Sequence, residues 1–148
     1  MRIVEKINEI LSSMVAGGDL ASYQYLTPSK HNVAVAKGVQ FPRAMFSAIT
    51  DRQISISKMR SNETAEVVID FCTLSNLKTT EFGADTMEAK IDAMGDIALQ
   101  FVKCVVSERS LMITTDNIEL TSLYDFTDTN LTGVRLRLTI KDKIGNCL

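Results

Sequence analysis

The sequence predicts an α+β fold, with a mostly antiparallel sheet of about four to five strands packed by two helices. Two observations predict it: apolar residues recur at helical spacing in two segments, and at every second position in the segments between and after them. The expected order is helix, long loop, three strands, helix, two strands. With 148 residues and 45% hydrophobic content, the chain can bury one core, so we expect a single domain over 1–148.

The first element is a helix over 2–16, because its apolar residues follow helical spacing and Gly17-Gly18 then supplies a stop signal. Helical and strand periodicity both fail over 19–40, which predicts a long projecting loop. This loop carries more apolar side chains than a solvated linker needs. Burial against a neighbouring subunit would explain them: Tyr23, Tyr25, Val33 and Val35.

Three strands are expected after the loop. A proline near the start suits a half-buried strand over 41–50. Ile54 and Ile56 then alternate with polar residues, and a polar tip over 58–63 leads to a third alternating segment over 65–72. This part of the chain predicts a meander whose tip projects into solvent.

The second helix is expected over 86–106. Asp85 can cap its first turn, and Glu88 can reach back toward the cap. Glu88, Asp92 and Asp96 form an outer stripe, for which a solvated face is a simpler explanation than a cation site.

Two more alternating segments, over 118–126 and 134–141, predict the last strands. The second of them places basic residues on its outward side, about 7 Å apart at about 3.3 Å per residue. Together with basic residues of the earlier hairpin they form a candidate interface or channel surface, with a solvated sheet face as the alternative. These residues are Arg52, Lys58, Arg60, Arg135, Arg137 and Lys141.

The last residues, 142–148, are expected to form a C-terminal tail. Ile144 and Leu148 give this tail apolar side chains that a frayed terminus does not need. We therefore group them with Tyr23, Tyr25, Val33 and Val35 as candidate subunit clamps.

No catalytic, cofactor or metal site is predicted. His31 is the only histidine and has no nucleophile signature beside it. The three cysteines are widely spaced without a CxxC pattern, and the chain has no glycine-rich phosphate loop. We therefore expect a protein that is not an enzyme, with no cofactor and no small-molecule substrate. The net charge of -2 and the lack of a long apolar run favour neither general nucleic-acid binding nor a membrane anchor.

The order of these elements resembles the tail terminator and related neck-ring (head-tail joining) proteins of tailed bacteriophages. Those chains run helix, long loop, strand, strand, helix, strand, strand over a comparable length. The resemblance covers nearly the whole chain as a pattern of elements. The chain departs from the family pattern in a larger arm before Phe41 and a longer hairpin tip near Asn62. The matching segments are Arg2 to Ala16, 41–50, 63–71, the helix from Asp85, and 133–140.

The resemblance implies a structural virion protein that assembles in the host cytoplasm into a homo-oligomeric ring, a hexamer or dodecamer. The ring would join the capsid portal to the tail, as a tail terminator or head-tail connector. Its partners would be other neck, portal or tail proteins, with non-specific contact to DNA in the channel. The basic residues would then face neighbouring rings or DNA, and the loop and tail would clamp adjacent subunits.

Two other functions stay open at this point. One is a small-ligand-binding or enzymatic α+β domain with a cleft under the loop over 19–40. The other is a non-viral adaptor domain that uses a sheet edge. A deep pocket with a perturbed carboxylate would favour the first, whereas a flat, concentration-dependent interface would favour a ring or an adaptor.

Overall fold

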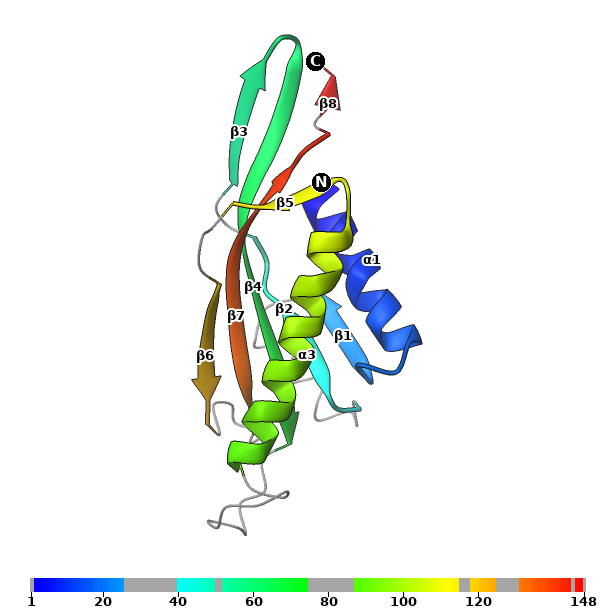
Figure 1. Cartoon of the computed structure of the whole chain (residues 1–148), viewed down its shortest axis with the longest axis vertical. Coiled ribbons are helices and arrows are strands. Elements are labelled where there is room, and N and C mark those ends of the chain that lie inside the picture. The colour runs from blue at the N-terminus through cyan, green and yellow to red at the C-terminus, as the bar shows by residue number, and fades with distance from the viewer. Residues whose placement is uncertain are drawn as a thin grey trace.

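The structure is a computed structural model that describes residues 2–25, 40–49, 52–74, 87–114, 118–124, 131–144 and 146–147. Within these residues, two helices and eight strands build an α+β fold, so the expected fold class is confirmed (Figure 1). The elements are α1 (Arg2–Ala16), β1 (Ser22–Tyr25), β2 (Arg43–Phe46), β3 (Arg52–Ser57), β4 (Arg60–Leu74), α3 (Met87–Ser107), β5 (Leu111–Ile113), β6 (Glu119–Leu123), β7 (Leu131–Asp142) and β8 (Asn146–Cys147).

Two long antiparallel strands, β4 and β7, form the centre of the sheet and pair from Thr64 with Lys141 to Leu74 with Leu131. The strand order is β1-β2-β4-β7-β5, with β3 and β8 on β4 and β6 on β7. β1 and β2 pair in parallel, so the sheet is mixed and not antiparallel throughout. It also has eight strands in place of the four to five expected. The extra strands are short, and a few residues do not show a period of two.

The loop expected over 19–40 is corrected at its start, because residues 22–25 form β1. The tail expected over 142–148 is corrected as well. Asp142 completes β7, and β8 pairs with Arg60 and Ser61 of β4. Backbone hydrogen bonding to a distant strand therefore orders a segment whose own sequence carries little signal. Several predicted features lie outside the described residues: His31, Val33, Val35, Asp85 and Leu148.

The polar tip expected over 58–63 is also corrected. β3 and β4 stay paired up to Ser57 with Arg60, so Lys58 and Met59 alone form the turn. Both have positive φ angles, 48° and 66°, as a two-residue hairpin turn of this kind requires. β4 is consequently a strand of 15 residues that runs from the turn through the core.

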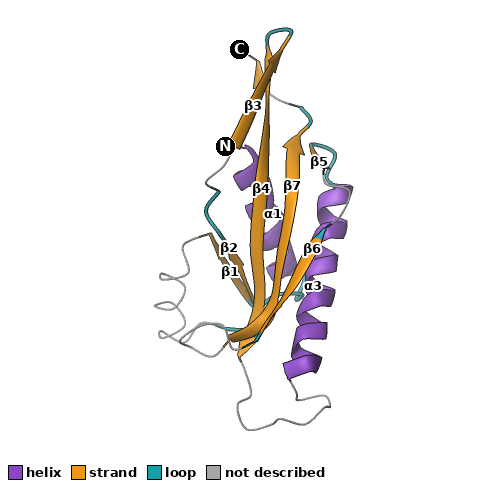
Figure 2. Ribbon diagram, turned by 90° about the vertical axis from the view of Figure 1, so that its left-hand side faces the viewer, coloured by secondary structure: helices purple, strands orange, loops and turns teal. Residues whose placement is uncertain are grey.

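Both helices lie on one face of the sheet (Figure 2). The predicted apolar faces of both helices are confirmed, because Ile7 and Leu11 of α1 and Phe101 of α3 are fully buried. The ring of Phe101 lies 5.9 Å, centroid to centroid, from that of Phe71 on β4. The sheet contributes its alternate side chains to the same core: Ala44, Phe46, Ala65, Val67, Ile69, Phe71, Val134, Leu136, Leu138 and Ile140.

The β3–β4 hairpin extends past the ends of both helices (Figures 1 and 2). Every side chain of β3 is exposed, whereas those of β2, which pairs farther along β4, are all buried. The molecule therefore has one end where helices cover the sheet and another where the hairpin stands without them.

Candidate interaction surfaces

The predicted basic row on β7 lies on the face of the sheet away from the helices. Arg135 and Arg137 alternate with Leu136 and Leu138, which are buried in the core. Arg135 binds Asp70 of β4 through two parallel bonds, Nε to Oδ1 at 2.8 Å and Nη2 to Oδ2 at 3.0 Å. The Asp70 side chain is only 3% exposed, and its hydrogen bonds to the guanidinium raise the pKa of Arg135. Arg135 is thus a partner of a buried carboxylate.

Arg137 is paired too, but at the surface. Its Nη1 lies 2.8 Å from Oε1 of Glu66, and its Nε lies 3.8 Å from Oε2 of Glu119 on β6. The Glu66 and Glu119 side chains are 48% and 70% exposed. Because carboxylates from both neighbouring strands face these arginines, the row contributes little net positive charge. Lys141, farther along β7, is half-buried.

A buried arginine that the sequence did not single out lies on this same side of the sheet. Arg43 of β2 is 2% exposed, and its guanidinium donates to the side chains of Ser22 and Gln24 on β1. Burial lowers the pKa of Arg43. All four side chains of β2 are buried, on both faces of the strand, and an alternating sequence pattern does not predict such a strand.

Cys72 adjoins Arg43 in the sheet and is fully buried in a small apolar cluster. Burial raises the pKa of its thiol to about 12, and nearby Asp70 adds to the shift. The thiol donates to the backbone oxygen of Arg43 at 3.5 Å. Cys72 is therefore a neutral packing group, since a buried thiol with a raised pKa stays protonated.

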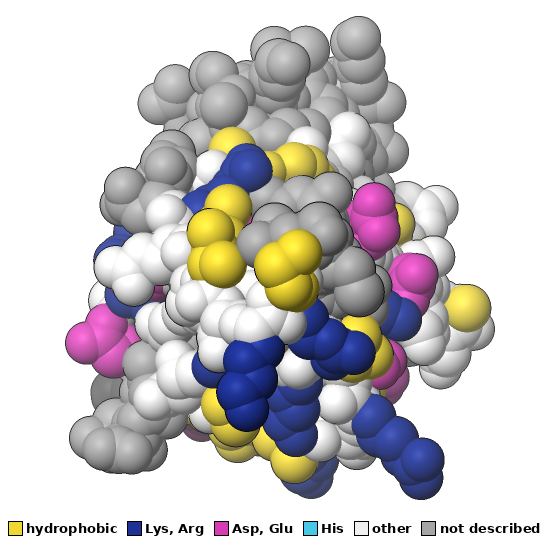
Figure 3. Space-filling model, turned by 90° about the horizontal axis from the view of Figure 1, so that it is seen from above, with side chains coloured by type: hydrophobic (Ala, Val, Ile, Leu, Met, Phe, Trp, Pro, Cys, Tyr) yellow, Lys and Arg dark blue, Asp and Glu magenta, His cyan; other side chains and the backbone are white. Residues whose placement is uncertain are grey.

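The hairpin carries the other predicted basic residues, Arg52, Lys58 and Arg60, all exposed. Unexpectedly, large apolar side chains are exposed among them. Ile54, Ile56 and Met59 are 66%, 69% and 71% exposed. Viewed from the hairpin end, the molecule shows hydrophobic side chains next to lysine and arginine side chains (Figure 3). We call Arg52, Ile54, Ile56, Lys58 and Met59 the hairpin surface.

The C-terminal segment lies against this hairpin. Arg60 Nη1 donates to the backbone oxygen of Ile144 at 3.4 Å, and Asn62 Nδ2 donates to that of Asp142 at 2.8 Å. Ile144 is 50% exposed. The structure therefore joins a predicted basic residue and a predicted clamp residue, 84 positions apart in the chain, at one end of the molecule.

The two predicted clamp tyrosines belong to the fold itself. Tyr23 packs against the main core from β1. The ring of Tyr25 lies 4.7 Å from that of Phe46, and its hydroxyl accepts the backbone N–H of Ile49 at 3.3 Å. Tyr25 is still 37% exposed, so part of the residue remains at the surface.

A further exposed surface lies on α3. Glu88, Asp92 and Asp96, expected there as an outer stripe, are exposed together with Leu99 and Val106, which are 47% and 70% exposed. We call these five residues the α3 flank. The hydroxyl of Tyr124 donates to Glu88 at 3.1 Å, which raises the pKa of Tyr124 and places the end of β6 beside the flank. The sequence prediction did not include Leu99 and Val106, because they lie off the apolar face of the helix, beside the carboxylates.

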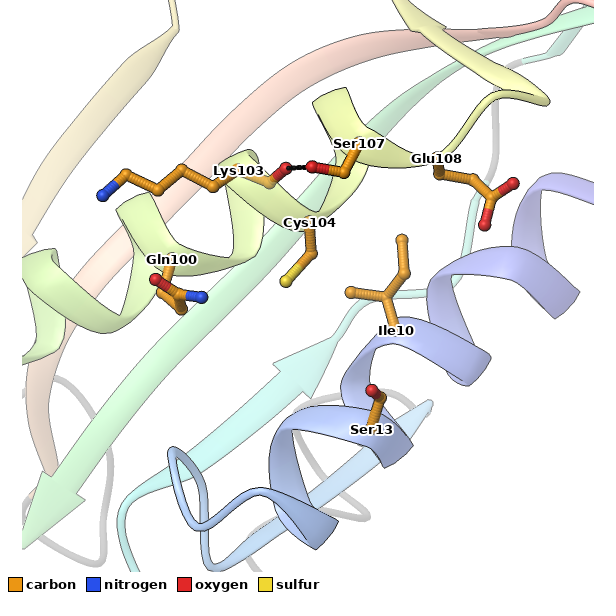
Figure 4. A pocket seen from close by; sticks show the side chains of 7 residues that line it. All are labelled: Ile10, Ser13, Gln100, Lys103, Cys104, Ser107 and Glu108. Atoms are coloured by element: carbon orange, nitrogen blue, oxygen red, sulfur yellow. Dashed lines mark hydrogen bonds between the residues drawn. The ribbon is translucent and has the colours of Figure 1, made fainter.

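A hollow of about 330 Å³ lies between α1 and α3, where Ile10 and Cys104 point toward one another (Figure 4). Its one carboxylate, Glu108, accepts hydrogen bonds from the backbone and side chain of Ser110, and these bonds lower its pKa. A lowered pKa suits a structural acceptor and not a general acid near neutral pH. Ser107, also on its wall, donates to the backbone oxygen of Lys103.

Within the described residues, no group of three or more His, Cys, Asp or Glu side chains is arranged to hold a metal ion. In the same part of the chain, neither helix combines the length and hydrophobicity that a membrane span needs. No protein-family model matches the chain, and no curated protein matches it.

Proposed function

We propose that the chain is a structural subunit that closes into a ring through contacts between unlike surfaces of neighbouring copies, in the neck or tail of a tailed bacteriophage. One observation carries the assembly part of this proposal. Ile54, Ile56 and Met59 project from the end of the molecule with about two thirds or more of each side chain in water. Three large apolar side chains on one projecting hairpin are typical of a contact site between proteins.

The order of elements supports the phage part of the proposal. After α1, the chain runs through β2, β3 and β4, then α3, then the pair β6 and β7. This order resembles that of the neck-ring proteins, with one strand more before the second helix. Three short strands, β1, β5 and β8, are further additions to that order. In this role the ring would connect the portal end of a capsid to its tail, and the protein would bind other neck or tail proteins without catalysing a reaction.

Contact with DNA, if the ring encloses it, would come from the hairpin in this proposal. Arg135 and Arg137 are paired with carboxylates, and a phosphate would have to displace those carboxylates. Arg60 is exposed on the hairpin, on the opposite face from Ile54 and Ile56. Such contacts would be non-specific and would weaken with salt, because they would rest on charge alone.

The first test is the mass of the purified protein over a concentration series, by light scattering and native mass spectrometry, with negative-stain microscopy of the same samples. The expected result is a discrete assembly that appears as a ring with a central channel. A monomer at every concentration, with no particles on the grid, would overturn the assembly proposal.

A second test concerns the phage part. Antibodies against this chain should label the head–tail junction or the tail of purified tailed particles from the source of the gene. Rings in solution without any such label would leave the ring in place and overturn its assignment to a virion.

A further inference from the structure

We propose that the hairpin surface of one copy docks on the α3 flank of the next copy in the ring. This inference rests on the proposed function, because it names the two surfaces that the ring would join. The two surfaces differ, so each docked copy still presents one free hairpin and one free flank. Contacts of this kind propagate until the chain of copies closes.

The hairpin surface continues the apolar face of the sheet beyond the helices. Arg52 pairs with Ala65, a core residue, and Ile54 and Ile56 follow it at alternate positions. They therefore belong to the face that α1 and α3 cover farther along, and their exposure of 66% and 69% shows that the described part of the chain leaves them largely uncovered. A helix from another copy would cover the hairpin in the same way that α1 and α3 cover the rest of this face of the sheet.

The turn of the hairpin points to the same use. Lys58 and Met59 adopt left-handed φ angles of 48° and 66°, which cost non-glycine residues about 1 kcal/mol or more each. Asn-Gly would form this turn with less strain. A strained turn that keeps a lysine and a 71% exposed methionine suggests that the side chains themselves are needed there.

Charge favours the α3 flank as the docking partner. Residues 52–63 include three cations, Arg52, Lys58 and Arg60, against one carboxylate, Glu63. The flank presents three carboxylates over 88–96 against one exposed cation at the same helical spacing, Lys103, while Lys90 donates its Nζ to the backbone oxygen of Leu74. Opposite charge steers two surfaces together and fixes their register.

Apolar content and length also match. Leu99 and Val106 follow the carboxylates on the flank, as Ile54 and Ile56 lie between the cations of the hairpin. β3 is about 20 Å long at about 3.3 Å per residue, and residues 88–106 span about 27 Å at about 1.5 Å per residue. One helix can therefore lie along the whole hairpin strand.

The test uses two charge-reversed proteins of the full chain. The first carries Arg52→Glu and Lys58→Glu, and the second carries Asp92→Lys and Asp96→Lys. Each alone sets like charges against one another and should lose the ring, giving monomers in native mass spectrometry. An equimolar mixture pairs opposite charges at every contact, and should restore assemblies of the wild-type size with the two proteins alternating.

A control with the same charge change, Glu5→Lys and Glu9→Lys on the exposed side of α1, should keep the ring. Ile54→Ser with Ile56→Ser should lose it while the far-ultraviolet circular dichroism stays that of the wild type. If the serine variant still forms rings of the wild-type size, or if the mixture of charge-reversed proteins stays monomeric, this inference is overturned and the proposed function still stands. A wild-type protein that never assembles would overturn the proposed function itself.

Discussion

Arg135 and Arg137 lie two positions apart on the same face of β7, yet their carboxylate partners differ greatly in exposure. The Asp70 side chain is 3% exposed and that of Glu66 is 48% exposed. Water can replace a lost partner at Glu66, but it cannot reach Asp70. A row that looks uniform in sequence therefore contains one structural ion pair and one surface pair.

Replacing each arginine separately should reveal this difference. Arg135→Ala leaves a buried charge without its partner and should lower the free energy of unfolding by about 3 kcal/mol. Arg137→Ala should lower it by less than about 1 kcal/mol. Urea denaturation followed by circular dichroism measures both, and equal losses would contradict the assignment. The Arg135 variant is consequently unsuitable for testing DNA contact.

Gly133 is a second residue whose role depends on a distant neighbour. A Cβ at this position would lie 1.9 Å from the backbone oxygen of Phe71, on the paired strand β4. The two central strands can approach this closely only because residue 133 has no side chain.

Gly133→Ala should therefore force β4 and β7 apart and lower the free energy of unfolding by about 3 kcal/mol. Gly95→Ala on α3 is the matched control, since a Cβ there meets no atom within 4 Å. Alanine is the better helix former, so this control should raise the free energy of unfolding by about 0.5 to 1 kcal/mol. A Gly133→Ala protein as stable as the wild type would refute the close approach.

At the scale of elements, the hairpin shows what the alternation of apolar and polar residues predicts and what it does not. Ile54 and Ile56 alternate with polar residues, and this pattern predicted β3 correctly. The predicted tip was too long because Lys58-Met59 lacks the glycine or asparagine that signals a two-residue turn. Turn type was decided by the pairing of the two strands, not by the turn residues.

Replacing the turn residues should relax the hairpin. Lys58→Asn with Met59→Gly removes two strained φ angles and should stabilise the hairpin by about 1 to 2 kcal/mol. Slower hydrogen exchange of the β3 amides in dilute, monomeric protein would report this gain. Unchanged exchange would show that the turn stores no strain. Under the docking proposal, the same variant should assemble less well despite its greater stability.

The whole molecule divides into a part where helices cover the sheet and a projecting hairpin without them. The described hydrophobic core joins α1 and α3 to the sheet, and the isoleucines of β3 are not part of it. Folding and assembly are therefore expected to depend on different residues, because the core provides stability and the hairpin provides a surface.

Shortening the hairpin tests that separation. Joining Gln53 to Thr64 through Asn-Gly removes the tip while keeping the pairs of Arg52 with Ala65 and of Gln53 with Thr64. The shortened protein should unfold cooperatively at nearly the wild-type temperature but form no ring. Leu136→Ala, a fully buried core change on β7, should instead lower the free energy of unfolding by about 2 to 5 kcal/mol. A shortened chain that fails to fold would show that the hairpin belongs to the folding core.

Long periodic segments were predictable from the sequence. The elements α1, α3, β4 and β7 are 12 to 21 residues long. The apolar period within each of them covers enough residues to be seen without the rest of the chain. These segments determined the α+β class and most of the core. The short strands β1, β5 and β8 were missed, because two to four positions carry no recognisable period.

The sequence by itself thus determined which residues are apolar at which spacing, and so the helices, the long strands and the positions of the candidate charged residues. Only the tertiary structure decided which charges are neutralised, since Asp70 and Arg135 are 65 positions apart and meet through strand pairing. It likewise decided that Ile54 and Ile56 stay exposed while equally apolar residues of β4 are buried. The physical reason is that burial and ion pairing depend on contacts between distant segments, which local periodicity does not encode.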